Sequence, residues 1–161
     1  MRMSDEPSIA VETVIKADAE RIYEIISDLD AMSSFGTEFQ GGEWVSGRPG
    51  TVGSTFLGRN RLNEHEWETT STVVEADKGK AFAWKVGDPD NHVAIWRATM
   101  RSVPNGTEVA YGFTHGPGES GLTSRIEAHP ESEESLIDAR LQMIQENIVK
   151  TLEGIRRRTA V

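Results

Sequence analysis

The sequence predicts an α+β domain in which a curved antiparallel sheet of about seven strands wraps around one long C-terminal helix. The first observation is a series of segments in which apolar and polar residues alternate, separated by short turn sequences. The second is a final segment whose apolar residues recur at steps of three and four. The length of 161 residues fits one domain with roughly 70% of its surface buried. We therefore expect residues 1–7 to form a flexible tail and residues 8–161 to form a single domain.

The N-terminal part is predicted to give one strand followed by one or two short helices. Residues 9–15 alternate between apolar and polar side chains, which indicates a strand. Asp18 is a residue type that caps helices, and the helix that it begins is expected to end by Ser27 and Asp28. Residues 30–35 are expected to form a second short helix.

Six further strands are expected in the middle of the chain. They are predicted at residues 43–45, 52–61, 66–73, 82–86, 92–101 and 107–115. The dipeptide Asn105-Gly106 between the last two is a strong signal for a two-residue hairpin. Because short turns join consecutive strands, these segments predict an antiparallel meander.

The C-terminal segment is the clearest helix in the chain. Residues 116–130 before it are rich in glycine and proline and are expected to form a loop. The apolar residues of the helix share one stripe: Ile137, Leu141, Ile144, Ile148, Leu152 and Ile155. Ser132 is placed to cap its start, and the arginines 156–158 at its end complement the helix dipole.

A long helix against a curved sheet also predicts a pocket. One apolar face of the sheet has to be covered, and this helix is the only element large enough to cover it. A curved sheet around a helix leaves space between them. Where side chains do not fill that space, it becomes a pocket with an apolar wall.

Composition excludes several classes of protein. The absence of cysteine rules out disulfides, cysteine-ligated zinc, thiol nucleophiles and iron–sulfur clusters. The net charge of −9 disfavours nucleic acid as a partner. No apolar stretch approaches the roughly 20 residues of a membrane helix, so we expect no stable membrane insertion. Together these features favour a cytoplasmic location.

Four short segments carry a resemblance to known proteins. They are Ala17–Tyr23, Val52–Asn60, Val74–Trp84 and Asn105–Val109. With the closing helix, they make the sequence similar to the START/Bet v 1-like (SRPBCC) superfamily, and within it to the polyketide cyclase/dehydrase-like proteins. The resemblance implies a helix-grip fold with a deep cavity. It also implies a superfamily of lipid carriers, cyclases, hormone receptors, hydroxylase subunits and chaperone activators, which share no universal catalytic residues.

Large aromatic residues on the inward-facing positions of the strands are the candidate ligand contacts. In a hollow fold such residues can either pack in the core or line the cavity. The candidate ligand-binding residues are Phe56, Asn60, Trp67, Trp84, Trp96, Tyr111, Phe113 and Met143. Asn60 either ties down the neighbouring backbone or points at a ligand, because a buried amide needs hydrogen bonds.

Histidine and tyrosine supply the candidate acid/base groups. His92, Tyr111 and His115 share the inward face of their predicted strands, so they are the candidate catalytic residues. The histidines lack metal-ligand spacing, and residues 116–121 match a dinucleotide motif in letters but lack its strand–helix context, so we expect neither metal nor cofactor. An arginine inside the cavity would have to be Arg125 or Arg140, and no pattern favours either.

Three functional hypotheses follow. The first is a carrier or sensor that binds a small hydrophobic or aromatic molecule between the sheet and the long helix. The alternative is an enzyme of the polyketide cyclase, aromatase or dehydratase type, in which the cavity folds the substrate and excludes water. The third is a protein-partner module that docks through its outer charges. The chain could also form a homodimer.

Overall fold

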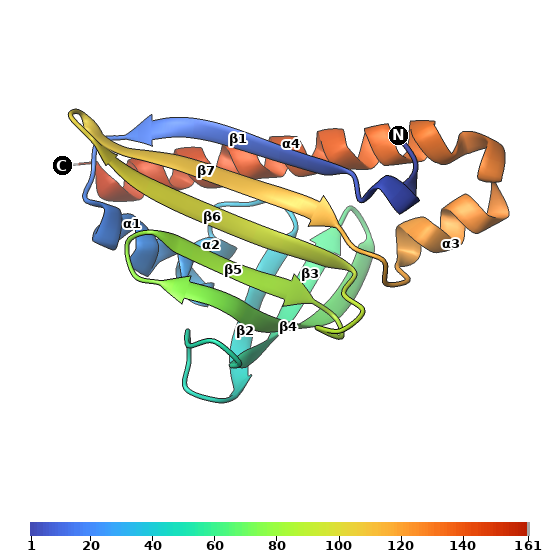
Figure 1. Cartoon of the computed structure of the whole chain (residues 1–161), viewed down its shortest axis with the longest axis horizontal. Helices are drawn as coiled ribbons and strands as arrows, with labels where there is room; N and C mark the ends of the chain where they lie inside the picture. The colour runs from blue at the N-terminus through green and yellow to red at the C-terminus, as the bar shows by residue number, and fades with distance from the viewer. Residues whose placement is uncertain (161) are drawn as a thin grey trace.

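Seven antiparallel strands form one sheet in the computed structural model, which describes residues 1–160 (Figure 1). Their order across the sheet is β1-β7-β6-β5-β4-β3-β2, so β1 and β2 lie at opposite edges. The strands are β1 (Ser8–Ile15), β2 (Phe39–Ser46), β3 (Thr55–Leu62), β4 (His65–Asp77), β5 (Ala81–Val86), β6 (Ala94–Val103) and β7 (Gly106–His115). The predicted α+β architecture is confirmed: a curved antiparallel sheet of seven strands, with short helices after the first strand and one long C-terminal helix.

Four α-helices and two 3-10 helices make up the rest of the regular structure in residues 1–160. They are η1 (Met3–Asp5), α1 (Ala19–Ile26), α2 (Leu29–Ser33), α3 (Gly121–Ala128), η2 (Pro130–Ser132) and α4 (Glu133–Thr159). Helix α4 runs along β1 and β7, whereas α1 packs on β5 and β6 and α2 packs on β2 (Figure 1). Helices α1, α2 and α4 therefore cover different parts of the inner face of the sheet. Within residues 1–160, no helix is long and apolar enough to cross a membrane.

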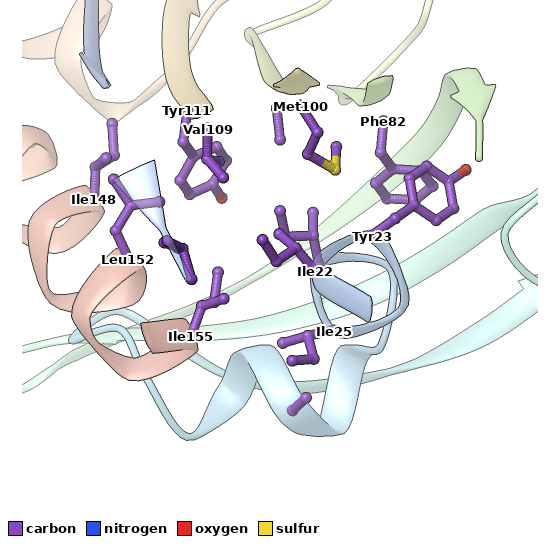
Figure 2. Close-up of a cluster of buried hydrophobic side chains, with 14 of the residues drawn as sticks. Ile22, Tyr23, Ile25, Phe82, Met100, Val109, Tyr111, Ile148, Leu152 and Ile155 are labelled. Carbon is purple, nitrogen blue, oxygen red and sulfur yellow. The ribbon is translucent and has the colours of Figure 1, made fainter. Parts of the chain in front are cut away.

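The main core lies where α1 and α4 meet the inner face of β5, β6 and β7. Figure 2 shows Ile22 and Ile25 of α1 opposite Leu152 and Ile155 of α4, with strand side chains closing the cluster. Every second residue of β7 is buried, from Thr107 to His115. This alternation fixes which face of the strand points inward.

The long helix starts differently from the prediction. Ser132 occupies its N-cap position, but the Ser132 side chain makes no capping hydrogen bond. The physical reason is that η2 leads directly into α4, so Ser132 has φ −103° and ψ 11° instead of the extended backbone that a capping serine adopts. By contrast, Asp18 caps α1 as predicted, with its Oδ1 accepting a hydrogen bond from the Glu20 N–H at 3.4 Å.

Residues 116–130 are not a continuous loop, which corrects the prediction. They contain α3, whose start is closed by Ser120 and Thr123: the Ser120 N–H donates to Thr123 Oγ1 at 2.6 Å, and the Thr123 N–H donates to Ser120 Oγ at 3.3 Å. No residue of α3 is buried. A helix that buries nothing needs no apolar stripe, so its sequence lacks the periodicity that predicts a helix.

Residues 1–7, where a flexible tail was expected, contact the rest of the domain. The Met3 N–H donates to Glu133 Oε2 at 2.8 Å, and the Pro7 carbonyl accepts from the His115 N–H at 2.9 Å. Pro7 is fully buried. The segment therefore joins the beginning of α4 to the end of β7.

The segment between α2 and β2 closes the free side of the sheet onto α4. Phe35 packs over Gly154, and the Arg158 guanidinium lies 5.2 Å from the centre of the Phe35 ring. Asn147 Oδ1 accepts from the Thr37 N–H at 2.7 Å. These contacts bring the chain before β2 onto one face of the helix, so the sheet and α4 enclose the interior.

Gly154→Leu is expected to destabilise the fold. A Cβ on Gly154 would lie 2.3 Å from Cδ1 of Phe35, so any side chain there must displace the ring. Overpacking of this kind costs about 2 kcal/mol. Urea denaturation should therefore show a lower free energy of unfolding for Gly154→Leu. The matched control is Gly121→Leu, where a Cβ meets no atom within 4 Å; equal stability of the two variants would contradict the assigned packing.

Candidate functional site

The inner face of the sheet carries a continuous band of aromatic rings, which we call the aromatic wall. Its members are Trp44, Phe56, Trp84, Trp96, Tyr111, Phe113 and His115, and neighbouring rings lie 4.8 to 6.5 Å apart between centroids. The register of the sheet places Trp84 opposite Trp96, and Trp96 opposite Phe113. On β4 the inward positions hold the smaller Ser71 and Val73, which lets Phe56 and Trp84 meet across that strand at 6.2 Å.

Other side chains do not cover the aromatic wall completely. Phe56, Tyr111 and Phe113 are buried, but Trp84 and Trp96 are only half-buried. The two indoles stack with an interplanar angle of 16° and a centroid distance of 6.3 Å. They present a flat apolar surface suited to a planar ligand.

Tyr111 lies beside these indoles, at 5.4 Å from Trp96 between ring centroids. Its burial raises the pKa of the phenol well above its usual value. Tyr111 is therefore an uncharged hydroxyl near neutral pH, able to donate or accept a hydrogen bond but not to act as a phenolate base. Figure 2 shows the Tyr111 ring among the core side chains, next to Val109.

A polar cluster formed by Glu38, Arg140 and His115 lies at one end of the wall. Arg140 of α4 donates two hydrogen bonds to the carboxylate of Glu38, from Nη1 to Oε2 at 2.6 Å and from Nη2 to Oε1 at 2.8 Å. The Glu38 side chain is about 10% exposed and that of Arg140 about 25%. A bidentate pair of this kind fixes the orientation of both side chains, and the two opposite charges balance each other.

His115 completes the polar cluster. Its ring stands edge-on to Phe113, with 4.8 Å between ring centroids. Burial, and then the positive charge of Arg140, lower the pKa of the His115 imidazole to about 4. His115 is therefore neutral near pH 7. Its Nε2 is buried and has no hydrogen-bond partner among residues 1–160.

A groove opens beside the wall at the end nearest α3. It has a volume of about 330 Å³ and is lined by β4, by the connection between β5 and β6 and by the start of α3, including Trp67, Thr69, Val93 and Ser120. A second hollow of about 320 Å³ lies between α2 and β2 and includes Asp28 and Trp44. Both adjoin the interior, because Val93 in the first and Trp44 of the aromatic wall in the second also pack against the core.

The predicted site residues fall into two groups. Phe56, Trp84, Trp96, Tyr111 and Phe113 stand together on the wall, as does the candidate base His115. The other three predicted ligand contacts do not. Trp67 lines the groove and stacks on His65 at 5.2 Å, Asn60 Nδ2 donates to Thr69 Oγ1 at 3.3 Å, and Met143 is half-buried on α4.

His92 is not on an inward-facing strand position, which corrects the prediction. Strand β6 begins only at Ala94, because a turn organised by Asp88 delays the extended backbone; Asp88 Oδ1 accepts from the Asp90 N–H at 2.9 Å. The His92 carbonyl accepts from the Gly118 N–H at 2.8 Å, and a Cβ on Gly116 would lie 2.5 Å from its ring. The backbone of His92 therefore holds the segment between β7 and α3.

Sequence reasoning missed the role of Glu38 and left Arg140 unassigned. Glu38 stands in an irregular segment with no pattern. Arg140 did carry a signal, since it lies three residues after Ile137 and four before Ile144, and so on the apolar face of the helix. A cation at such a position needs a buried partner. Arg97 and Arg101 face outward, where they pair with Glu75 and Glu108.

Glu38→Ala is expected to cost about 2 kcal/mol of stability. Removing one partner of a buried pair leaves the other charge uncompensated. The loss of stability is smaller here than for a fully buried pair, because Arg140 keeps partial solvent contact. The measurement is urea denaturation of both single variants and of Glu38→Ala/Arg140→Ala. The double variant should cost clearly less than the sum of the two single variants. Strict additivity would show that the pair makes no energetic contribution.

Comparison with known proteins identifies the family to which the chain belongs. A family described as "Polyketide cyclase / dehydrase and lipid transport" matches residues 6–148. The chain belongs to this family. No curated protein matches the sequence. The match covers the whole aromatic wall and the polar cluster.

Solved structures support the same fold. The Polyketide_cyc-like protein Cgl2372 from Corynebacterium glutamicum is 26% identical, with a TM-score of 0.66 over 93% of this chain and 89% of that chain. Major latex-like protein 151 from Panax ginseng is 11% identical, with a TM-score of 0.68 over 96% and 98%. The protein TTHA0849 from Thermus thermophilus is 16% identical, with a TM-score of 0.69 over 95% and 97%. The last two likenesses show the fold alone. The SRPBCC helix-grip prediction is therefore confirmed.

Proposed function

We propose that the protein binds one small hydrophobic or aromatic molecule against the aromatic wall, between the sheet and α4, as a carrier or sensor. The observation that carries this proposal is the wall itself: aromatic rings in continuous contact across the inner face, with Trp84 and Trp96 left half-buried at its centre. Large aromatic surfaces facing an interior are typical of small-molecule sites. The net charge of −9 and the absence of cysteine support a cytoplasmic setting for this activity.

A second candidate is catalysis of the cyclase or dehydratase type. Two groups favour it: His115, whose imidazole is neutral at pH 7 and whose Nε2 has no partner among residues 1–160, and the hydroxyl of Tyr111 on the same strand. A neutral imidazole can accept a proton from a positioned carbon or oxygen acid, and Tyr111 can donate a hydrogen bond to the developing oxyanion. In this reading the wall orients the substrate and excludes water.

Native mass spectrometry of the freshly purified protein tests binding. The expected spectrum shows the 17.8 kDa chain with one small-molecule adduct, which organic solvent releases for identification. A bare mass, together with no thermal shift from a panel of aromatic compounds, would contradict the proposal. Incubating the released compound with the protein separates the two candidates. A carrier returns it unchanged, whereas an enzyme converts it and His115→Gln binds it without converting it.

A further inference from the structure

His115 has a polar atom that is buried and unpaired. The residue is 4% exposed, and its Nε2 has no hydrogen-bond partner within residues 1–160. It shares the inward face of β7 with Tyr111 and Phe113, as the alternating burial of that strand requires. A buried polar group without a partner lowers stability, and folded proteins rarely leave one without a reason. A ligand that supplies the missing partner would recover that loss.

The charges around His115 disfavour an ionised ligand group. Arg140 lies close enough to lower the pKa of the imidazole, so an ammonium group beside it would be repelled. Glu38 already occupies Arg140 with both of its carboxylate oxygens, so a second carboxylate would enter a buried site with no cation free for it. Burying an unpaired charge is far more costly than burying an uncharged polar group.

A hydroxyl group satisfies His115 in either of its neutral forms. One nitrogen of a neutral imidazole donates and the other accepts. A hydroxyl can do both, so it pairs with Nε2 whichever tautomer is present. The apolar part of such a ligand would continue onto the wall, because Phe113 stands 4.8 Å from the His115 ring and Trp96 stands 4.9 Å from Phe113, between centroids.

We propose that His115 Nε2 determines specificity by pairing with an uncharged hydroxyl of an aromatic ligand whose ring lies on the aromatic wall near Trp96 and Phe113. This inference rests on the proposed function and adds the chemical class of the ligand: a neutral hydroxylated aromatic rather than an acid, an amine or a plain hydrocarbon.

Three probes with the same ring system test it: naphthol, naphthalene and naphthoate, measured by equilibrium dialysis at neutral pH. In the wild type, naphthol is expected to bind about 10-fold more tightly than naphthalene, which is a hydrogen bond of about 1.4 kcal/mol. Naphthoate is expected to bind more weakly than naphthalene, because its carboxylate finds no free cation.

Two variants assign the preference to His115. His115→Phe keeps a ring at the position but removes the nitrogen, so naphthol and naphthalene should bind within about 2-fold of each other, as the loss of one hydrogen bond requires. His115→Gln keeps a hydrogen-bonding group and should retain part of the preference. The wild-type comparison stands by itself if His115→Phe does not fold.

The outcomes separate this inference from the proposed function. Equal binding of naphthol and naphthalene to the wild type, or a naphthol preference that persists in His115→Phe, would overturn the role of His115 and leave the binding function standing. Tighter binding of naphthoate would overturn the charge argument. If none of the three probes binds, the proposed function fails, and this inference fails with it.

Discussion

The free energy of unfolding is expected to fall by about 3 kcal/mol as the pH is lowered from 6.5 to 4, through His115 alone. The pKa of the His115 imidazole is about 4 in the folded protein and 6.5 in an unperturbed histidine. Between these values the unfolded chain binds a proton that the folded protein excludes, so stability decreases as the pH falls. Each unit of pKa difference contributes about 1.4 kcal/mol. Well above pH 6.5 neither state is protonated, and the contribution is constant.

Urea denaturation across this pH range, with His115→Gln as the matched variant, isolates the effect. Other groups titrate in both proteins, so the difference between the two curves reports His115. The wild type should lose more stability than the variant between pH 6.5 and 4. Parallel curves would contradict both the burial of the imidazole and the influence of Arg140 on its pKa.

Trp96→Ala is expected to weaken ligand binding by about 100-fold. Trp96 is the member of the aromatic wall that contacts Trp84, Tyr111 and Phe113 together. Removing a central aromatic contact from a binding site typically costs about 2 kcal/mol or more. A cost of about 2.8 kcal/mol, at about 1.4 kcal/mol per tenfold, gives this loss. Stability should also fall, by about 3 kcal/mol. The measurement is the affinity for naphthol, or for the compound recovered from the purified protein.

Two control variants separate binding from folding. Ile155→Ala lies on α4, is fully buried and should destabilise the fold to a similar extent without touching the wall. Arg97→Ala changes the neighbouring residue on the outer face of β6, where Arg97 pairs with Glu75. Both should keep wild-type affinity. If Ile155→Ala loses as much affinity as Trp96→Ala, the loss reflects general destabilisation and the wall is not the binding surface.

The sequence predicts most of the fold because each strand has one solvent-exposed face and one buried face. In β7, for example, alternation alone identifies Val109, Tyr111, Phe113 and His115 as inward-facing, and all four are buried. Helix α4 is equally legible from its apolar stripe. Prediction fails where burial does not decide the structure. Helix α3 is an example, since it buries no residue and is stabilised by the local hydrogen bonds of Ser120 and Thr123.

The sequence predicts only part of the candidate site, because some of its residues are brought together by contacts between distant segments. Its aromatic members come from the strand alternation, so Trp84, Trp96 and Phe113 could be chosen from parity. The Glu38–Arg140 pair joins residues 102 positions apart, one of them in an irregular segment. Which arginine turns inward depends on how the segment before β2 closes onto α4. No local pattern encodes that closure.

Nuclear magnetic resonance titration of the labelled protein with naphthol tests the central claim most directly. The tryptophan indole N–H signals report the inner face of the sheet. The arginine Nε–H signals of Arg97 and Arg101 report the outer face, where these residues pair with Glu75 and Glu108. We predict that the indole signals of Trp84 and Trp96 shift in proportion to occupancy while the arginine signals stay in place. Shifts confined to the arginines, with unmoved indoles, would show that the outer face is the docking surface and would contradict a ligand site on the aromatic wall.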